Sequence, residues 1–211
     1  EAPQALALIG EAAEAAQVGG RITQQLLTFA RQQPMRVEVL ELGAFCSDHR
    51  GLFERSLGES IALQMTLPDA PLSIQADRSQ LIVALLNLLV NSREATGSRG
   101  EVRLRVEQLD VIGRHSEWRK LAAGRHALLQ IIDQGCGMSA EIRRNALKPF
   151  FTTRSEGGGT GLGLSMVEGF VAQSCGQIYL RSEPGAGTTV SMVFPAMGWA
   201  VPRGAAGLGE G

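Results

Sequence analysis

Three short stretches of the sequence combine residue types that can bind a charged, flat ligand. The first holds Asn87 and Asn91, four residues apart in an apolar segment that predicts a helix over 79–95, so both amides project from one face. Amides in such a helix are costly to bury unless they are satisfied. The two amides can be satisfied by hydrogen bonds that cap a helix or join two helices. Alternatively, their oxygens can ligate Mg²⁺, a hard ion that binds oxygen. The two residues alone leave both interpretations open.

The second stretch is Asp133-Gln134-Gly135-Cys136-Gly137-Met138, directly after a predicted strand. A carboxylate fixed at a strand end can accept a hydrogen bond from an exocyclic amine such as that of adenine. Glycines at two-residue spacing let the backbone approach a flat ligand closely. The pattern D-x-G-x-G is weak by itself, because many β-turns share it.

The third stretch, GGGTGLGL over 157–164, leads into a helix predicted over 162–174. A glycine run at a helix N-terminus presents backbone N–H groups and the positive end of the helix dipole to an anion. The run lacks the Lys-Ser/Thr ending of a P-loop, and no strand immediately precedes it as in a Rossmann fingerprint. The alternative for this stretch alone is a mobile linker.

The elements that must position these stretches are helices mixed with strands. A turn at 68–71 predicts a hairpin of two strands, and a second hairpin closes the sequence. This mixture, without regular βαβ alternation, predicts an α+β fold: a two-layer α/β sandwich whose mixed, largely antiparallel sheet is covered by helices on one face. The predicted strands are 61–67, 72–76, 102–109, 126–133, 177–182 and 188–194, and the helices are 46–57, 79–95 and 162–174.

A long helix is predicted before this sandwich, and a tail after it. Residues 1–34 are rich in helix formers, carry an apolar stripe at helical spacing from Val18 to Phe29, and end at Pro34. A lone helix of this kind needs a partner to bury its stripe, either another helix or a second copy of the chain. The sequence therefore divides into units at 1–34, 35–197 and 198–211, the last a flexible tail or linker.

Composition and charge limit the kinds of partner and cellular location that the sequence predicts. The 211 residues are 44% hydrophobic and 19% charged, with a formal net charge of −1, which gives no reason to expect nucleic acid as a partner. Three scattered cysteines predict free thiols in a reducing compartment. No apolar run is long enough to span a bilayer, so we expect this part to be cytoplasmic. The sequence starts without Met, so a longer parent protein with its own membrane anchor is compatible with it.

In this order and spacing, the three stretches resemble the N, G1 and G2 boxes of histidine-kinase catalytic domains. That family belongs to the ATPase superfamily shared with DNA gyrase, the ninety-kilodalton heat-shock chaperone and the mismatch-repair ATPases. Between the second and third stretches, KPFFTTR over 148–154 resembles the F box. The resemblance covers nearly all of residues 35–195, and residues 22–34 resemble the end of the dimerisation helix that precedes such domains.

The resemblance implies roles for individual residues. Asn91 would bind Mg²⁺, and Asn87 beside it would support the metal or a phosphate. Asp133 would accept the adenine amine, with Thr189 assisting it through a water. The other nucleotide-binding candidates shape the base pocket or belong to the F and G2 boxes: Gly135, Gly137, Phe151, Thr152, Thr153, Arg154, Gly159, Thr160, Gly161, Leu162, Gly163 and Leu164.

The resemblance also implies a function. The module would bind Mg-ATP and transfer the γ-phosphoryl to a histidine on a dimerisation helix, for relay to an aspartate of a response-regulator receiver domain. Residues 1–34 would be a partial second dimerisation helix that forms a homodimer in the parent protein. The phosphoacceptor histidine is missing, since His49, His115 and His126 stand elsewhere, so the chain alone is expected to be inactive in autophosphorylation.

Two alternatives remain. The first is an ATP-hydrolysing clamp of the gyrase or chaperone type, whose members carry a glutamate as general base one turn before the metal-binding Asn. Here that position is Asn87, which cannot take a proton from water and so favours the kinase. The second is a nucleotide-binding regulatory protein of the anti-sigma type, which does not need the long helix ending at Pro34. Glu94 stands where many relatives carry Lys, a feature of one familiar subgroup.

Overall fold

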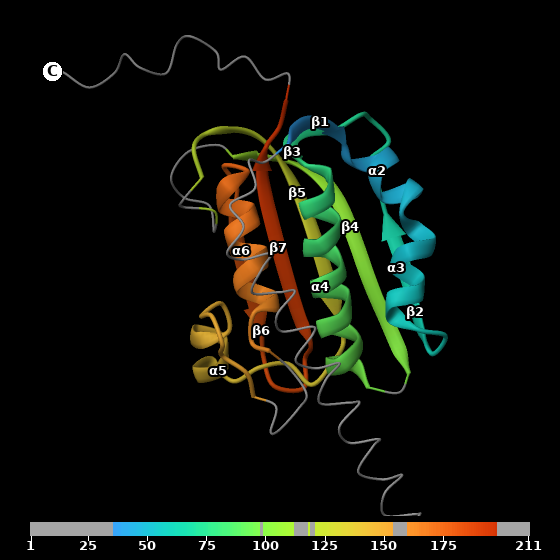
Figure 1. Ribbon diagram of the computed structural model, residues 1–211, viewed down its shortest axis with the longest axis vertical. Coiled ribbons are helices and arrows are strands. Elements are labelled where there is room, and N and C mark those ends of the chain that lie inside the picture. Colours follow the sequence, from blue (N-terminus) through green and yellow to red (C-terminus); the bar gives the residue numbers. More distant parts are fainter. Residues whose placement is uncertain (1–35, 98, 112–117, 119–120, 154–159, 198–211) are drawn as a thin grey trace, which may run out of the picture.

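The computed structural model describes residues 36–97, 99–111, 118, 121–153 and 160–197 (Figure 1). The predicted helix over 1–34 and the tail from 198 lie outside the described residues, as do Arg154 and Gly159 of the predicted site. No helix of the described part is both long and apolar enough to cross a lipid bilayer.

The main sheet has five strands in the order β2-β4-β5-β7-β6. β2 and β4 run parallel, and every other neighbouring pair is antiparallel, so the predicted mixed, largely antiparallel sheet is confirmed. The predicted closing hairpin is also confirmed as β6 and β7. The strands are β2 (Ile61–Thr66), β4 (Gly100–Val111), β5 (Gly124–Asp133), β6 (Gln177–Ser182) and β7 (Thr188–Pro195).

The predicted hairpin between 61–67 and 72–76 was wrong, although both strands exist. β2 pairs with β4, whereas β3 (Ser73–Asp77) pairs with β1 (Val37–Glu41) in a separate two-stranded sheet. Pro71 has no N–H to continue a ladder with β2. The next residue, Leu72, instead accepts a hydrogen bond from Leu42 N at 2.9 Å, which directs the chain toward β1.

Helices cover one face of the main sheet, as predicted. α3 (Arg50–Leu57), α4 (Arg78–Thr96) and α6 (Gly163–Gln173) lie side by side across it, with α4 in the middle (Figure 1). The single helix predicted over 46–57 is two helices, α2 (Leu42–Asp48) and α3. They are separated by His49, whose ring Nδ1 lies 2.7 Å from the Phe45 carbonyl oxygen and so competes with helical continuation.

α4 is the central support of the structure. The Asp77 carboxylate caps its first turn by accepting a hydrogen bond from Gln80 N at 3.0 Å, and Gly97 with φ +80 ends it. Between these ends the helix packs fully buried side chains against β4 and β5. The core residues of this contact are Leu81, Leu85, Leu88 and Leu89 on α4 with Val102, Leu104, Leu129 and Ile131 on the strands.

Removing a buried side chain from α4 should therefore destabilise the whole domain. Leu85 is 0% exposed, and Leu85→Ala should lower the free energy of unfolding by about 2–5 kcal/mol, because transfer free energy is lost and a cavity remains. Val83 lies on the same helix at 43% exposure, so Val83→Ala should change stability by less than about 0.5 kcal/mol. Urea unfolding measures both, and equal losses would contradict this packing.

Candidate functional site

The carboxylate of Asp133, at the end of β5, is buried and held by three hydrogen bonds. Its Oδ1 accepts hydrogen bonds from Gly135 N at 2.9 Å and from Thr188 N at 3.1 Å. Its Oδ2 accepts one from Ser92 Oγ on α4 at 3.1 Å. The side chain is only 6% exposed, so three separate segments fix its orientation at one end of the sheet.

The electrostatic surroundings of the Asp133 carboxylate favour its role as a hydrogen-bond acceptor. Burial raises the pKa of Asp133 above its ordinary value, and the hydrogen bonds from Gly135, Ser92 and Thr188 oppose that rise. All three donors are neutral, and none of the described residues forms a salt bridge with Asp133. A buried carboxylate held in this way keeps its strength as an acceptor for a further N–H donor.

The loop after Asp133 is held between α4 and the turn that joins β6 to β7. Cys136 N donates to the Ala95 carbonyl oxygen at 3.0 Å, and the Cys136 carbonyl accepts from Gly185 N at 2.8 Å. The loop that carries Gly135 and Gly137 is therefore fixed on both sides by backbone hydrogen bonds.

These contacts leave no room for side chains at the two glycines. A Cβ on Gly135 would lie 2.5 Å from the carbonyl carbon of Ala95. A Cβ on Gly137 would overlap the Glu183 carbonyl oxygen, and Gly137 also has φ +66, which other residues seldom adopt. Both glycines are therefore required by the close approach of the neighbouring backbone.

The two predicted amides of α4 meet the start of α6. A Cβ placed on Gly163 would lie 3.6 Å from Asn87 Oδ1 and 3.7 Å from Asn91 Nδ2, so the first residue of α6 lies against both side chains. Both amides are half-buried. Within the described part of the chain, no hydrogen bond joins either amide to another residue, so their oxygens remain available to a ligand.

The N-terminus of α6 lies next to Asn87 and Asn91. Its N-cap residue, Leu162, provides no side-chain hydrogen bond, and the helix runs for 11 residues. The first N–H groups of a helix lack partners inside it and lie at the positive end of its dipole. Beside Asn87 and Asn91, these groups can bind an anion.

Residues 160–164, the described part of the glycine-rich stretch, help to anchor α6. Leu162 is 1% exposed and Leu164 packs on the core, so neither leucine side chain faces solvent beside the amides. Thr160 Oγ1 accepts from Leu162 N at 3.4 Å. Gly161 has φ +66, and its Cα lies so close to the backbone of Phe150 that a side chain would overlap it.

Of the predicted F box, the structure describes residues 148–153. Phe151 is half-buried, and its N donates to the Lys148 carbonyl oxygen at 3.2 Å. Thr152 and Thr153 are exposed. The contact between Gly161 and Phe150 brings this segment next to the start of α6.

Thr188, rather than the predicted Thr189, is the residue next to Asp133. Thr188 pairs with Asp133 across β5 and β7, whereas Thr189 pairs with Ile132 and faces the other side of the sheet. The strand register therefore places Thr188, and not the predicted Thr189, beside Asp133. Ser92 was also missed, although a polar residue directly after Asn91 on an apolar helix was a signal for it.

A metal at this site would have to use oxygen atoms of amides and of a bound ligand. The described residues hold no group of three or more His, Cys, Asp or Glu side chains that could bind a metal ion. Mg²⁺ keeps several waters and is commonly held by few protein ligands together with substrate phosphates. The amides of Asn91 and Asn87 fit that pattern.

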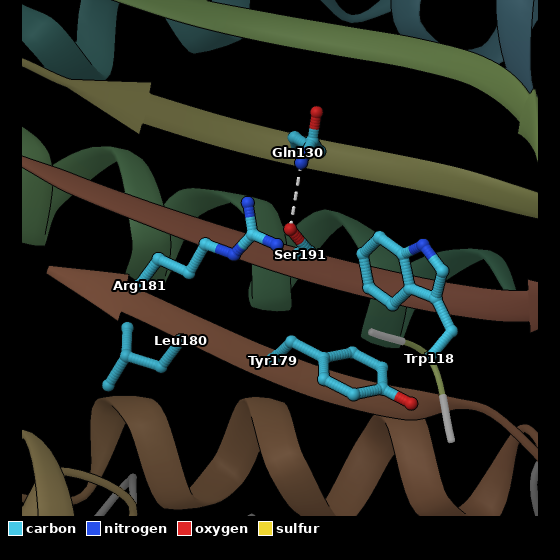
Figure 2. A pocket seen from close by; sticks show the side chains of 6 residues that line it. All are labelled: Trp118, Gln130, Tyr179, Leu180, Arg181 and Ser191. Carbon is cyan, nitrogen blue, oxygen red and sulfur yellow. Dashed lines mark hydrogen bonds between the residues drawn. The ribbon is translucent and has the colours of Figure 1, made fainter. Parts of the chain in front are cut away.

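A separate hollow of about 170 Å³ lies on the sheet face away from the helices (Figure 2). There Trp118 packs edge-on against Tyr179, with ring centroids 4.6 Å apart, and Gln130 Nε2 donates to Ser191 Oγ at 2.8 Å. Gln130, Tyr179 and Ser191 alternate with core residues of their strands, so the sheet separates this hollow from Asp133 and the amides. It is not part of the site.

Residues 76–197 match the family described as histidine kinase-, DNA gyrase B-, and HSP90-like ATPase. Sensor kinase CckA of Brucella abortus (strain 2308) is 36% identical over 179 residues, covering 83% of this chain and 19% of that protein. The signal transduction histidine-protein kinase AtoS of Escherichia coli (strain K12) is 30% identical over 176 residues, covering 83% of this chain and 26% of that protein. The chain thus spans about a fifth to a quarter of the length of these relatives.

Solved structures agree with this match. The mycobacterial sensor histidine kinase MprB is similar with a TM-score of 0.60 and 25% identity, covering 76% of this chain and 97% of that one. Full-length ShkA in complex with AMPPNP is similar with a TM-score of 0.68, covering 92% of this chain and 38% of that one. At 19% identity, the second likeness shows the fold alone.

The close approach at Gly137 can be tested against a glycine of matched conformation. Gly185 has φ +76, near the +66 of Gly137, but a Cβ there would meet nothing within 4 Å. Gly185→Ala should therefore cost only about 1 kcal/mol of stability, from backbone strain. Gly137→Ala carries the same strain plus the overlap with Glu183. It should cost at least about 1 kcal/mol more in urea unfolding and speed amide exchange at Gly135 and Cys136. Equal effects of the two variants would contradict this packing.

Proposed function

Because this chain belongs to the histidine kinase-, DNA gyrase B-, and HSP90-like ATPase family, we propose that it is the ATP-binding catalytic module of a two-component sensor histidine kinase. In the parent protein the module transfers the γ-phosphoryl of ATP to a histidine on a dimerisation helix, for relay to a receiver aspartate. One observation carries this proposal: the buried Asp133 carboxylate lies beside a glycine loop and accepts a hydrogen bond from Ser92 of α4. The same helix presents Asn87 and Asn91.

The Asp133 end recognises the base. Its carboxylate accepts a hydrogen bond from the exocyclic amine of adenine, while the Thr188 N–H donates to its Oδ1. The adenine ring lies against the backbone of the loop that carries Gly135 and Gly137, which is held in place by its contacts with Ala95 and Glu183. Recognition by a fixed acceptor and a fixed loop requires little rearrangement of the protein.

The α6 end recognises the phosphates. The oxygen of Asn91 binds Mg²⁺, and Asn87 supports the metal or a phosphate. When bound, Mg²⁺ supplies neutralisation of the phosphate charge. The uncapped N–H groups at the start of α6, with Gly161 and Gly163, hold phosphate oxygens. The remaining proposed contacts are Phe151, Thr152, Thr153, Arg154, Gly159, Thr160, Leu162 and Leu164.

Position 87 supports phosphoryl transfer to a protein side chain rather than to water. Asn87 can orient a water molecule but cannot remove its proton, which forgoes the roughly 10²–10⁴-fold that a general base supplies. Glu94 is exposed and lies one turn beyond Asn91, away from the position of such a base. In phosphoryl transfer, positioning and charge neutralisation supply most of the rate, which this site can provide.

The proposal extends to the parts outside the described residues. Residues 1–34 form the end of the second dimerisation helix and join two copies in the parent protein. Residues 35–197 are the catalytic domain, and residues 198–211 are a linker or tail. The partners are ATP or ADP and the receiver domain of a response regulator, with this module in the cytoplasm.

Replacing the acceptor should weaken nucleotide binding. Asp133→Asn presents an amide that donates as well as accepts, so binding of ADP with Mg²⁺ should weaken by about 1–3 kcal/mol in isothermal titration. Asp69→Asn is the matched control, because Asp69 is exposed in the connection between β2 and β3 and should leave the affinity unchanged. Equal affinity of the Asp133 variant and the native chain would remove Asp133 from the base site.

A second test separates the kinase from the hydrolase. Incubated with γ-labelled ATP, the chain should neither release phosphate appreciably nor label itself on histidine. A separate fragment that carries a dimerisation helix with its phosphoacceptor histidine should restore acid-labile label, on that fragment. Steady phosphate release that Glu94→Gln abolishes would instead establish an ATP-hydrolysing clamp.

A further inference from the structure

Ser92 lies between the two ends of the proposed site, and none of the proposed ligand contacts involves it. It follows Asn91 directly on α4, is 4% exposed, and donates through Oγ to Asp133 Oδ2 at 3.1 Å. Asp133 itself is 6% exposed. Two polar groups are therefore buried together between a helix and the end of a strand.

The direction of this hydrogen bond is specific. A serine inside a helix commonly donates to the carbonyl four residues earlier, which here is that of Leu88. The Ser92 hydroxyl instead leaves its own helix and reaches β5. A buried polar group that lacks its partner costs about 1–3 kcal/mol, so this pair is held in the folded chain.

The two oxygens of Asp133 differ in how they are held. Oδ1 has two donors, both backbone N–H groups, from Gly135 and Thr188, and these stay in place whatever the side chains are. The only donor that reaches Oδ2 within the described part of the chain is Ser92. The orientation of Oδ2 therefore depends on one side chain.

We propose that Ser92 is a positioning residue for base recognition: by holding Oδ2, it orients the carboxylate that accepts the exocyclic amine of the purine. The inference rests on the proposed function, because it assigns a partner to the acceptor in that same site. Since Ser92 and Asn91 are consecutive residues of α4, the helix sets the base acceptor and the metal ligand in one fixed relation.

The charged groups around Asp133 leave its ionisation to these neutral donors. On α4, Arg93 Nη1 donates to the Ser56 carbonyl at 2.8 Å, and Glu94 is exposed. In the β6–β7 turn, Glu183 is also exposed, while β4 presents Val102 opposite Asp133. Residues 136–138 and Thr188, the first residue of β7, carry no charged side chain.

Removing the Ser92 donor should therefore favour the protonated carboxyl. Burial already raises the pKa of Asp133, and the Ser92 hydrogen bond lowers it, so the pKa in Ser92→Ala lies higher still. Only the ionised form accepts from an amine at both oxygens. Affinity for an amine-bearing base should then be lost as the pH falls through that pKa, and in the variant the loss should begin at a higher pH.

The experiment compares ADP with inosine diphosphate, which carries an oxygen in place of the amine, by isothermal titration from neutral to mildly acidic pH. Ser92→Ala should weaken ADP binding about tenfold at neutral pH, as expected for loss of a hydrogen bond to a charged group. Its acid limb should move to higher pH, and its affinity for inosine diphosphate should change less than about twofold. Ser92→Cys keeps a weak donor of similar size and should give an intermediate profile.

The outcomes separate the proposals. If the native chain binds no ADP, the proposed function itself fails. If the native chain binds ADP and Ser92→Ala binds it equally well, only the role of Ser92 is overturned. Parallel weakening for both nucleotides with an unchanged pH profile, in a variant whose unfolding curve matches the native one, also overturns it, since that result means a general packing role.

Discussion

Burial of the Asp133 carboxylate is the constraint that ties this fold together at its functional end. Taking a carboxylate out of water is expensive unless hydrogen bonds replace the lost hydration. Here the replacements come from its own loop, from β7 and from α4, so the register of β7 on β5 and the placement of α4 are both fixed by one side chain. A helix shifted along the sheet, or a strand shifted by one residue, would remove one of these donors from a buried carboxylate.

The same end of the sheet is closed by backbone rather than by side chains. Gly187 has φ +80 and lies so close to the Asp133 carbonyl that a Cβ there would overlap it, and Gly137 stands in the same relation to Glu183. Two loops in such close contact cannot move apart without losing the hydrogen bond between Gly185 and Cys136. The loop beside Asp133 is therefore held in place by the fold itself.

Sequence reasoning identified the residues whose type breaks a pattern. Asn87 and Asn91 interrupt an apolar helix, and Asp133 ends an apolar strand, so each drew attention without any knowledge of its neighbours. The pairing of β2 with β4 was not predicted, because it depends on contacts distant in the chain, whereas a local turn suggested a hairpin. Thr189 in place of Thr188 shows how a one-residue error in a strand moves a side chain to the opposite face. Ser92 was missed for a related reason: its role exists only in a hydrogen bond between elements.

The two ends of the site differ in how tightly the fold defines them, and α4 is what they share. At the proposed base end, Asp133 and Cys136 are held by hydrogen bonds to other elements. At the proposed phosphate end, the start of α6 is held against α4, where Gly163 lies against Asn87 and Asn91. Gly161 lies against the backbone of Phe150, which fixes the residues just before α6 to the rest of the domain. Because α4 carries the two amides and also Ser92, a displacement of this helix would disturb both ends at once.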